Sequence, residues 1–287
     1  MLHGAGSFGL AFRDGAFTQR LEEEYVVVYF DQRGQSMAQG HYDQPDDLID
    51  LMASDVEALT QVLQHTYGRD IKLFLMGHSW GGLLSASALL RGNYQYAFNG
   101  WINLDGLMDL PSASTYRKDL IISIANEQTD IGNSITEWQG IQEKVAALNP
   151  ASDDDYGEIL KCAGQSMKLL LADGVIASSS SSEKLYRALM DNNPVTWQVS
   201  HFFNQPVAYA REIEYSVLNE LGKIDIPSLF IYGKYDVSVP PDAGKDAFEK
   251  LGTTDKTYLR FDQSAHHPHD TEPGRFADEV MRYISLH

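Results

Sequence analysis

The sequence is poor in cysteine, since Cys162 is the single one among 287 residues. One thiol cannot form a disulfide within the chain, and no zinc site with the usual spacing of Cys and His can be built around it. We interpret Cys162 as a small buried hydrophobic residue. The chain is therefore expected to fold without a disulfide and without a structural metal.

Basic residues are also scarce. Lys and Arg total 22 against 40 Asp and Glu, which gives a formal net charge of -18 at pH 7. A chain with this excess of negative charge repels the phosphates of nucleic acids and the anionic surface of membranes. We therefore expect a small-molecule substrate, with neither nucleic acid nor membrane as a partner.

Long apolar runs are missing as well. No uninterrupted apolar stretch is long enough to cross a bilayer, and the first residues lack the basic region, apolar core and cleavage site of a signal peptide. A cytoplasmic location is the expectation that follows. Hydrophobic residues nevertheless make up 43% of the 287 positions, which suffices for one main α/β domain that carries an insertion.

The most informative motif is a G-x-S-x-G pentapeptide at residues 77–81. It follows the apolar segment 71–76, which is typical of a buried strand, and precedes the small-residue segment 83–90, which is typical of a helix. Glycines on both sides of the serine let strand and helix pass closely, so Ser79 stands at the tip of a sharp turn. Ser79 is a candidate nucleophile; the alternative is a helix N-cap in a pattern that arose by chance.

Strands and helices alternate over the first hundred residues. We predict strands at 25–30, 71–76 and 101–104, and helices at 17–24, 45–67 and 83–90, the second of these with apolar residues on one side and acids opposite. Such alternation predicts a mostly parallel sheet with right-handed crossovers. Ligands bind at the carboxyl ends of the strands in sheets of this kind.

The alternation stops between residues 106 and 221, where the chain becomes helical and polar. Segments 153–155 and 178–182 are predicted to be exposed loops, because a run of acids or of serines cannot bury itself. Strands are expected again at 226–232 and 257–261, and helices at 242–251 and 273–284. The predicted domains are therefore a core formed by residues 1–105 and 222–287, and a helical cap formed by residues 106–221.

A serine nucleophile needs a base and a carboxylate that orients the base. Asp236 follows the expected strand 226–232, and the histidines of segment 264–269 follow the expected strand 257–261. These groups should meet Ser79 at the carboxyl edge of the sheet. The chain order is serine, aspartate, histidine.

This arrangement resembles the α/β-hydrolase superfamily over essentially the whole chain. The similar segments are the oxyanion loop at 3–6, the nucleophile elbow at 77–81, the acid turn at 232–236, and a G-H-x-P-H…E-P segment at 265–273. The resemblance implies an α/β-hydrolase fold, a mostly parallel sheet flanked by helices with a helical cap. The strands that usually precede the oxyanion loop are missing, so we expect a truncated gene product or a homodimer that covers the exposed sheet edge.

The resemblance also implies the catalytic roles. Ser79 attacks a carbonyl carbon, His266 accepts the proton, and Asp236 stabilises the imidazolium. The backbone N–H groups of Ala5 and Trp80 are expected to stabilise the oxyanion. This mechanism requires no metal and no organic cofactor.

Other residues remain alternatives or have structural interpretations. His267 and His269 are read as structural or rim residues, each a rival to His266 as the base. His3 and the histidine before Ser79 are read as turn residues that bond to the backbone. Asp105, after the expected strand 101–104, is the rival acid or a turn residue.

Several segments are similar to the proline-iminopeptidase branch of the superfamily: Asp31 to Gly34, the tryptophan after Ser79, and Tyr235-Asp236 with two prolines downstream. Enzymes of that branch hold the substrate's ammonium group with acids of the cap, which implies a role for Glu212 and Glu214. The chain departs from the branch where Val199 takes the place of an amine-binding glutamate.

The function we predict is that of a serine hydrolase that cleaves an ester or amide bond of a small substrate through an acyl-enzyme intermediate. A proline-iminopeptidase-like aminopeptidase is the alternative among enzymes. From another class, the alternative is a non-catalytic small-molecule receptor on a hydrolase fold.

Overall fold

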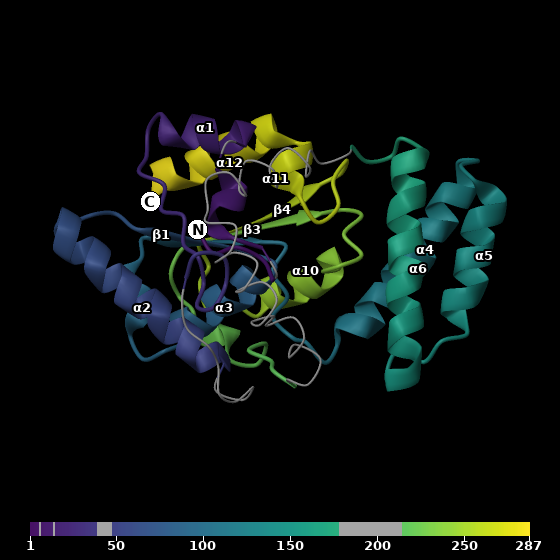
Figure 1. The fold of residues 1–287 in the computed structure, drawn as a ribbon, viewed down its shortest axis with the longest axis horizontal. Helices are drawn as coiled ribbons and strands as arrows, with labels where there is room; N and C mark the ends of the chain where they lie inside the picture. Colours follow the sequence, from purple (N-terminus) through teal and green to yellow (C-terminus); the bar gives the residue numbers. More distant parts are fainter. Residues whose placement is uncertain (6, 14, 39–47, 178–213) are drawn as a thin grey trace.

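A computed structural model describes residues 1–5, 7–13, 15–38, 48–177 and 214–287. At its centre lies a sheet with the strand order β1-β2-β3-β4 (Figure 1). Its strands are β1 (Phe74–His78), β2 (Gly100–Leu104), β3 (Ser228–Gly233) and β4 (Lys256–Phe261). All three neighbouring pairs are parallel. The parallel sheet predicted from the alternating pattern is therefore present.

Helices cover both faces of the sheet (Figure 1). One face carries α2 (Leu48–Tyr67), α3 (Trp80–Leu89) and α10 (Pro241–Glu249), and the other carries α1 (Ala16–Glu22), the short α11 (Pro268–Thr271) and α12 (Pro273–Leu286). Short 3₁₀ turns lie at Gly9–Phe12, Tyr94–Ala97 and Leu221–Lys223.

The central strands divide their side chains between two hydrophobic cores. Trp101 of β2 and Phe230 of β3 point into the core beneath α2 and α3, whereas Ile102 and Ile231 point into the core beneath α1 and α12. This division follows from the two-residue period of a strand. Every residue of β2 and β3 is buried, which is typical of parallel strands with helices on both faces.

A second group of helices lies beside the sheet: α4 (Ala113–Asp130), α5 (Ile135–Ala146) and α6 (Asp153–Ala172). We call it the α4–α6 bundle. It has a core of its own, in which Trp138 and Cys162 are fully buried. Cys162 is thus a buried hydrophobic residue, as we interpreted it from the sequence.

The prediction of a loop at residues 153–155 was wrong, although Asp153 and Asp154 are exposed as expected. These three aspartates form the first turn of α6, where Ser152 is the N-cap and its Oγ accepts a hydrogen bond from the N–H of Asp155 at 3.4 Å. Acidic side chains are stabilised at the start of a helix by the positive end of its dipole. The acidic run is therefore a helix-start signal here. The serine run at 178–182 lies outside the described residues.

The prediction of a strand at residues 25–30 was also wrong for most of that segment, in which Phe30 alone forms a β-bridge. Leu2 forms parallel bridges to Phe30 and to Gly77, and within the part of the chain that the structure describes no other bridge joins segment 25–30 to a neighbour. Beyond Leu2 lies an apolar cavity of about 650 Å³, lined in part by Val27 and Leu73. Because a strand needs a continuous neighbour to form its ladder, an apolar sequence alone does not make segment 25–30 a strand.

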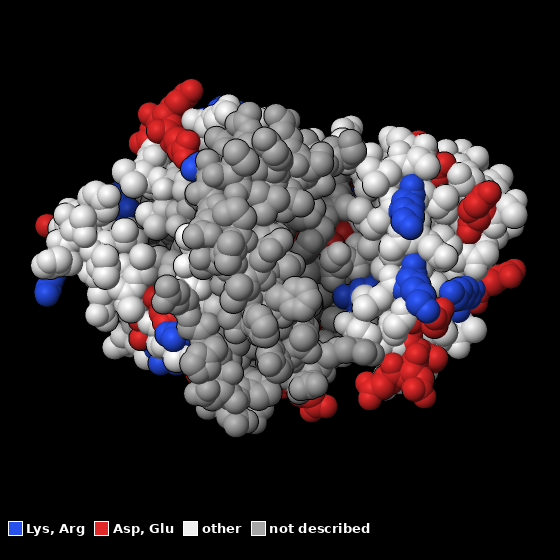
Figure 2. All heavy atoms as spheres, in the orientation of Figure 1, with Lys and Arg blue, Asp and Glu red and all other residues white. Residues whose placement is uncertain are grey.

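Figure 2 shows acidic and basic side chains interspersed on the visible face of the α4–α6 bundle, with acidic atoms gathered at one end. Among the helices that the structure describes, none is both long enough and apolar enough to span a membrane.

Close packing explains the glycines around the turn from β1 to α3. A Cβ atom at Gly77 would lie 2.1 Å from the carbonyl oxygen of Gly81, and a Cβ atom at Gly81 would lie 2.4 Å from the carbonyl oxygen of Leu2. Both obstacles are backbone atoms, which cannot rotate out of the way. Only glycine fits at either position without moving the strand, the helix or the first loop.

We therefore expect Gly77→Ala to lower the free energy of unfolding by about 1–3 kcal/mol or more, the usual cost of overpacking. Gly140→Ala is the matched control, because nothing lies within 4 Å of a Cβ atom at that exposed position of α5. It should raise the free energy of unfolding by about 0.5–1 kcal/mol. Urea denaturation of both variants measures the difference; equal effects would contradict the packing argument.

Candidate active site

Ser79 occupies a strained position between β1 and α3. Its backbone has φ 55° and ψ -118°, a left-handed conformation that is rare for residues other than glycine. It stands at the N-cap position of α3, yet its side chain makes no capping hydrogen bond. Strain of this kind costs about 1–3 kcal/mol and clusters at functional sites. The capping alternative for Ser79 therefore has no support in the geometry.

His266 and Asp236 form a hydrogen-bonded pair. The Nδ1 atom of His266 lies 2.7 Å from Oδ2 of Asp236. The other oxygen, Oδ1, accepts hydrogen bonds from the backbone N–H groups of Ser238 at 2.8 Å and Val239 at 2.9 Å. With both of its oxygens engaged, the fully buried carboxylate fixes the orientation of the imidazole ring. An imidazole held through Nδ1–H presents Nε2 as a base.

The histidine that precedes Ser79 connects the two halves of the site. Nε2 of His78 lies 2.9 Å from the carbonyl oxygen of His266, to which it donates, and the two rings lie 4.7 Å apart between centroids. Burial and the neighbouring imidazoles lower the pKa of His78 well below its usual value. His78 is therefore a neutral residue that bonds to the backbone, as we read it from the sequence, and it ties the nucleophile turn to the histidine loop.

Asp105, the rival acid, lies in the same site. It follows β2 with φ 47° and is fully buried. Its Oδ1 atom accepts a hydrogen bond from the N–H of Gly233 at 3.0 Å. A carboxylate oxygen of Asp105 also lies within 4.8 Å of ligand nitrogens of His78 and His266. Burial, and then the negative charge of Asp236, raise the pKa of Asp105 well above its usual value. Asp105 thus supports the end of β3, while Asp236 holds the histidine.

The first loop packs against the turn at Ser79. A Cβ atom at Gly4 would lie 3.3 Å from Cβ of Ser79, so the loop that carries Ala5 approaches the serine closely. His3 holds this loop: its Nδ1–H donates to the carbonyl of Gly4 at 2.8 Å, and its Nε2 accepts from the N–H of Gln32 at 3.2 Å. Burial lowers the pKa of His3 to about 4. It is a neutral turn residue, in agreement with our interpretation of the sequence.

Trp80 is the first residue of α3. N–H groups in the first turn of a helix have no acceptor within that helix, so they are available to an anion. The backbone N–H of Trp80 thus lies next to Ser79 at the positive end of a helix. This position suits an oxyanion-binding group.

The α4–α6 bundle holds the turn that carries Asp236. Nε of Arg117 donates to the carbonyl of Val237 at 2.8 Å, and Nη2 donates to the carbonyl of Ser238 at 2.9 Å. Glu127 of the same helix accepts hydrogen bonds from Lys234 at 2.7 Å and from Tyr235 at 2.8 Å. We did not find Arg117 or Glu127 from the sequence. Their partners lie more than a hundred residues away, and no local pattern marks them.

The two predicted substrate-binding acids are Glu212 and Glu214. Glu212 and Val199 lie outside the described residues. Glu214 is exposed, and none of the contacts found among the described residues joins it to Ser79 or His266. Substrate binding by these acids stays a prediction.

Comparison with known proteins identifies the family of this chain. A family described as Serine aminopeptidase, S33 matches residues 1–274. The chain belongs to this family. The S33 chain is accordingly a hydrolase of the α/β-hydrolase superfamily.

Relatives and solved structures point the same way. The S33 chain is 24% identical to a probable aminopeptidase, YbaC, of Bacillus subtilis, over 94% of this chain and 83% of that protein. It is 23% identical to a proline iminopeptidase of Saccharolobus solfataricus, over 73% of this chain and 61% of that protein. An esterase from Exiguobacterium antarcticum has the same fold, with a TM-score of 0.60 at 18% identity, covering 99% of this chain and 90% of the other.

The two aspartates of the site can be separated by substitution. We expect Asp236→Asn to lower kcat by about 10⁴-fold, because an amide in the place of this triad carboxylate favours the wrong tautomer of the histidine. Asp105→Asn should lower kcat by no more than about tenfold, since an amide oxygen can still accept from the N–H of Gly233 and at most one hydrogen bond changes. Steady-state hydrolysis of an activated ester measures both effects. The reverse ranking would make Asp105 the acid.

Proposed function

We propose that the S33 chain is a serine hydrolase that cleaves an ester or amide bond of a small substrate through the groups of Ser79, His266 and Asp236. The observation that carries the proposal is the hydrogen bond between His266 and the buried Asp236, at the same edge of the parallel sheet as the strained Ser79. A serine hydroxyl is a weak nucleophile unless such a base takes its proton.

The reaction proceeds in two halves. In the first, Oγ of Ser79 forms a bond to the carbonyl carbon while its proton passes to Nε2 of His266; the proton then goes to the leaving group as the bond to that group breaks. In the second, water gives a proton to His266 and its oxygen bonds to the acyl carbon; the bond from that carbon to Oγ of Ser79 then breaks, His266 returns the proton to Oγ, and the acid product leaves. Asp236 stabilises the imidazolium in both halves. The backbone N–H groups of Ala5 and Trp80 stabilise the oxyanion.

The α4–α6 bundle supports the proposal of a cap over residues 106–221. Its core includes Ile121, Trp138 and Leu170, and it continues into Tyr235 and Ala265, which flank the acid and the base. Helices that are packed this way on the catalytic loops are suited to enclose a small substrate. The cap's shape would then select the acyl group and the leaving group.

An aminopeptidase is the second candidate function. The description of the family and the names of both relatives favour it. The formal charge of -18 suits a substrate with a free ammonium group. A receptor without catalysis is disfavoured, because a binding pocket has no need of a hydrogen-bonded acid and base next to a strained serine. A cytoplasmic location and a homodimer stay predictions from the sequence.

Covalent labelling tests the nucleophile. A fluorophosphonate probe should label the protein at Ser79, and Ser79→Ala should abolish the labelling. Ser285→Ala is the matched control, because it removes an exposed serine near the end of α12; it should be labelled like the parent. Equal labelling of Ser79→Ala and the parent, mapped by peptide mass spectrometry, would contradict the proposed nucleophile.

A substrate panel separates the two candidate functions. p-Nitrophenyl esters of increasing acyl length are compared with the naphthylamides of proline and alanine, each with a free and with an acetylated amine. An aminopeptidase should cleave the free-amine arylamides and lose activity when the amine is acetylated. Rapid ester turnover without any arylamide cleavage would remove the aminopeptidase.

A further inference from the structure

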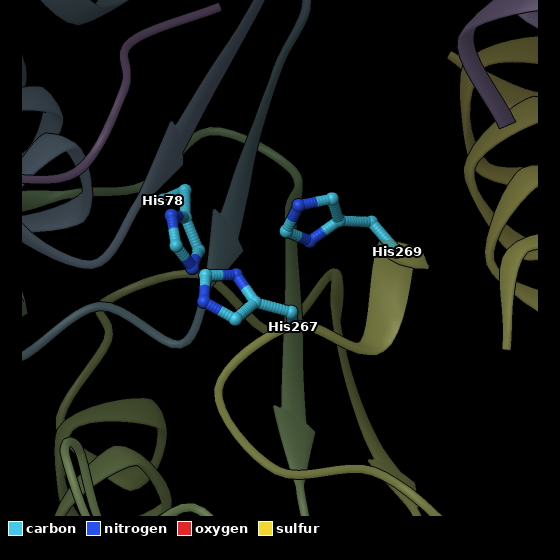
Figure 3. Close-up of side chains that lie close together, drawn as sticks. All are labelled: His78, His267 and His269. Carbon is cyan, nitrogen blue, oxygen red and sulfur yellow. The ribbon is translucent and has the colours of Figure 1, made fainter. Parts of the chain in front are cut away.

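Three imidazoles that the mechanism does not use lie close together (Figure 3). Two of them, His78 and His267, lie beside the ring of His266, with centroid distances of 4.7 Å and 5.2 Å. His78 lies at the end of β1, and His267 and His269 lie at the start of α11. One ring nitrogen from each of the three lies within 4.8 Å of the other two. The cluster joins a strand end to a loop almost two hundred residues further along the chain.

The three imidazole rings differ in how deeply they are buried. His78 is 6% exposed and His269 is 4% exposed, whereas His267 is at the surface. The ring of Phe12 packs against both buried imidazoles, with centroid distances of 6.1 Å to His78 and 5.5 Å to His269. Two of the three positions are therefore fixed by packing, and the third gives solvent access to the cluster.

The spacing suits a transition-metal ion. A tetrahedral ion with metal–nitrogen bonds of about 2.0–2.1 Å places its nitrogens roughly 3.4 Å apart. The three ring nitrogens lie within 4.8 Å of one another, so the rings must move closer together to bind an ion, and His267 is the exposed one of the three. Asp270 lies next to the cluster, with Oδ2 at 3.7 Å from Nε2 of His269. A carboxylate behind a metal-binding imidazole fixes the ring and makes it a better ligand.

We propose that His78, His267 and His269 bind one divalent transition-metal ion, such as Zn²⁺ or Co²⁺, and that the bound ion inhibits the hydrolase. Imidazole is a ligand for these ions, whereas Mg²⁺ and Ca²⁺ require oxygen ligands. Water from the solvent fills the fourth position. The inference that the ion inhibits the enzyme rests on the proposed function. The inference that the three histidines bind the ion does not.

The inhibition follows from how the cluster is connected to the base. His78 donates a hydrogen bond to the carbonyl of His266, and His267 is the next residue in the chain. Nε2 of His78 cannot both donate to this carbonyl and bind an ion, so an ion held there breaks the bond to the backbone of His266 and, through His267, pulls on the neighbouring residue. The imidazole of His266 must stay 2.7 Å from Asp236 to act as a base. Metal binding thus displaces it from its working position.

Binding is measured first, on the full-length protein without a histidine tag. Calorimetry with Zn²⁺ and the visible spectrum of added Co²⁺ should show one ion per chain, and Mg²⁺ and Ca²⁺ should show none. His267→Asn should weaken binding at least about tenfold, the lower range for disturbing a metal's ligand set. His267→Cys should restore Zn²⁺ affinity, because a thiolate is also a zinc ligand.

His65→Asn is the matched control, because it removes an exposed histidine from α2, at a distance in the fold from α11. It should bind Zn²⁺ like the parent. Absence of binding in the parent, or equal affinity in the parent and His267→Asn, would overturn the proposed site. A purely structural His267 would not be rescued by cysteine.

Inhibition is measured second, with an activated ester and each variant compared with its own metal-free rate. Zn²⁺ should inhibit the parent and His65→Asn over the concentration range in which it binds, and a chelator should restore both. His267→Asn should need at least about tenfold more Zn²⁺. Stoichiometric binding without loss of activity would overturn the inhibitory role. An inactive parent that still binds Zn²⁺ would contradict the proposed function and leave the metal site standing.

Discussion

The parallel pairing of β1, β2, β3 and β4 is the constraint on which the rest of the structure depends. Because all four strands run in the same direction, their carboxyl ends meet at one edge of the sheet. Ser79, Asp105 and Asp236 follow the first three strands, and His266 follows the fourth. His78 at the end of β1 is thereby brought to hydrogen-bond distance of the backbone of His266, 188 positions further along the chain. The chemistry of the site depends on this alignment more than on any single loop.

A second set of contacts stabilises the strained backbone conformations of the site. Ser79 and Asp105 both have positive φ values, and both lie where a strand ends. Such conformations persist only where the surrounding structure fixes them. Here, glycines allow the strand, helix and first loop to touch, His78 bonds to the histidine loop, and Arg117 holds the acid turn from the α4–α6 bundle. The bundle that would enclose the substrate therefore also positions the acid.

Local patterns in the sequence predicted most of the core. The strand before Ser79, the acid turn at Asp236 and the histidine segment at His266 each carry a recognisable sequence of apolar run and turn, and a parallel sheet follows from their alternation. Segment 25–30 shows the limit of this reasoning, because its apolar residues predict a strand, yet Leu2 is its one bridge partner among the described residues. The role of Arg117 depends on tertiary packing that periodicity does not encode. Segment 153–155 shows that an acidic run can mark a helix start as well as a loop.

The central claim is that the serine, the imidazole and the carboxylate act as one unit at this edge of the sheet. The most direct test is a crystal structure of the protein after reaction with a fluorophosphonate. The account predicts phosphorus bonded to Oγ of Ser79, one phosphoryl oxygen at about 2.7–3.1 Å from the N–H groups of Ala5 and Trp80, and His266 still bonded to Asp236. Phosphorus on another residue, or an imidazole turned away from Ser79, would contradict it.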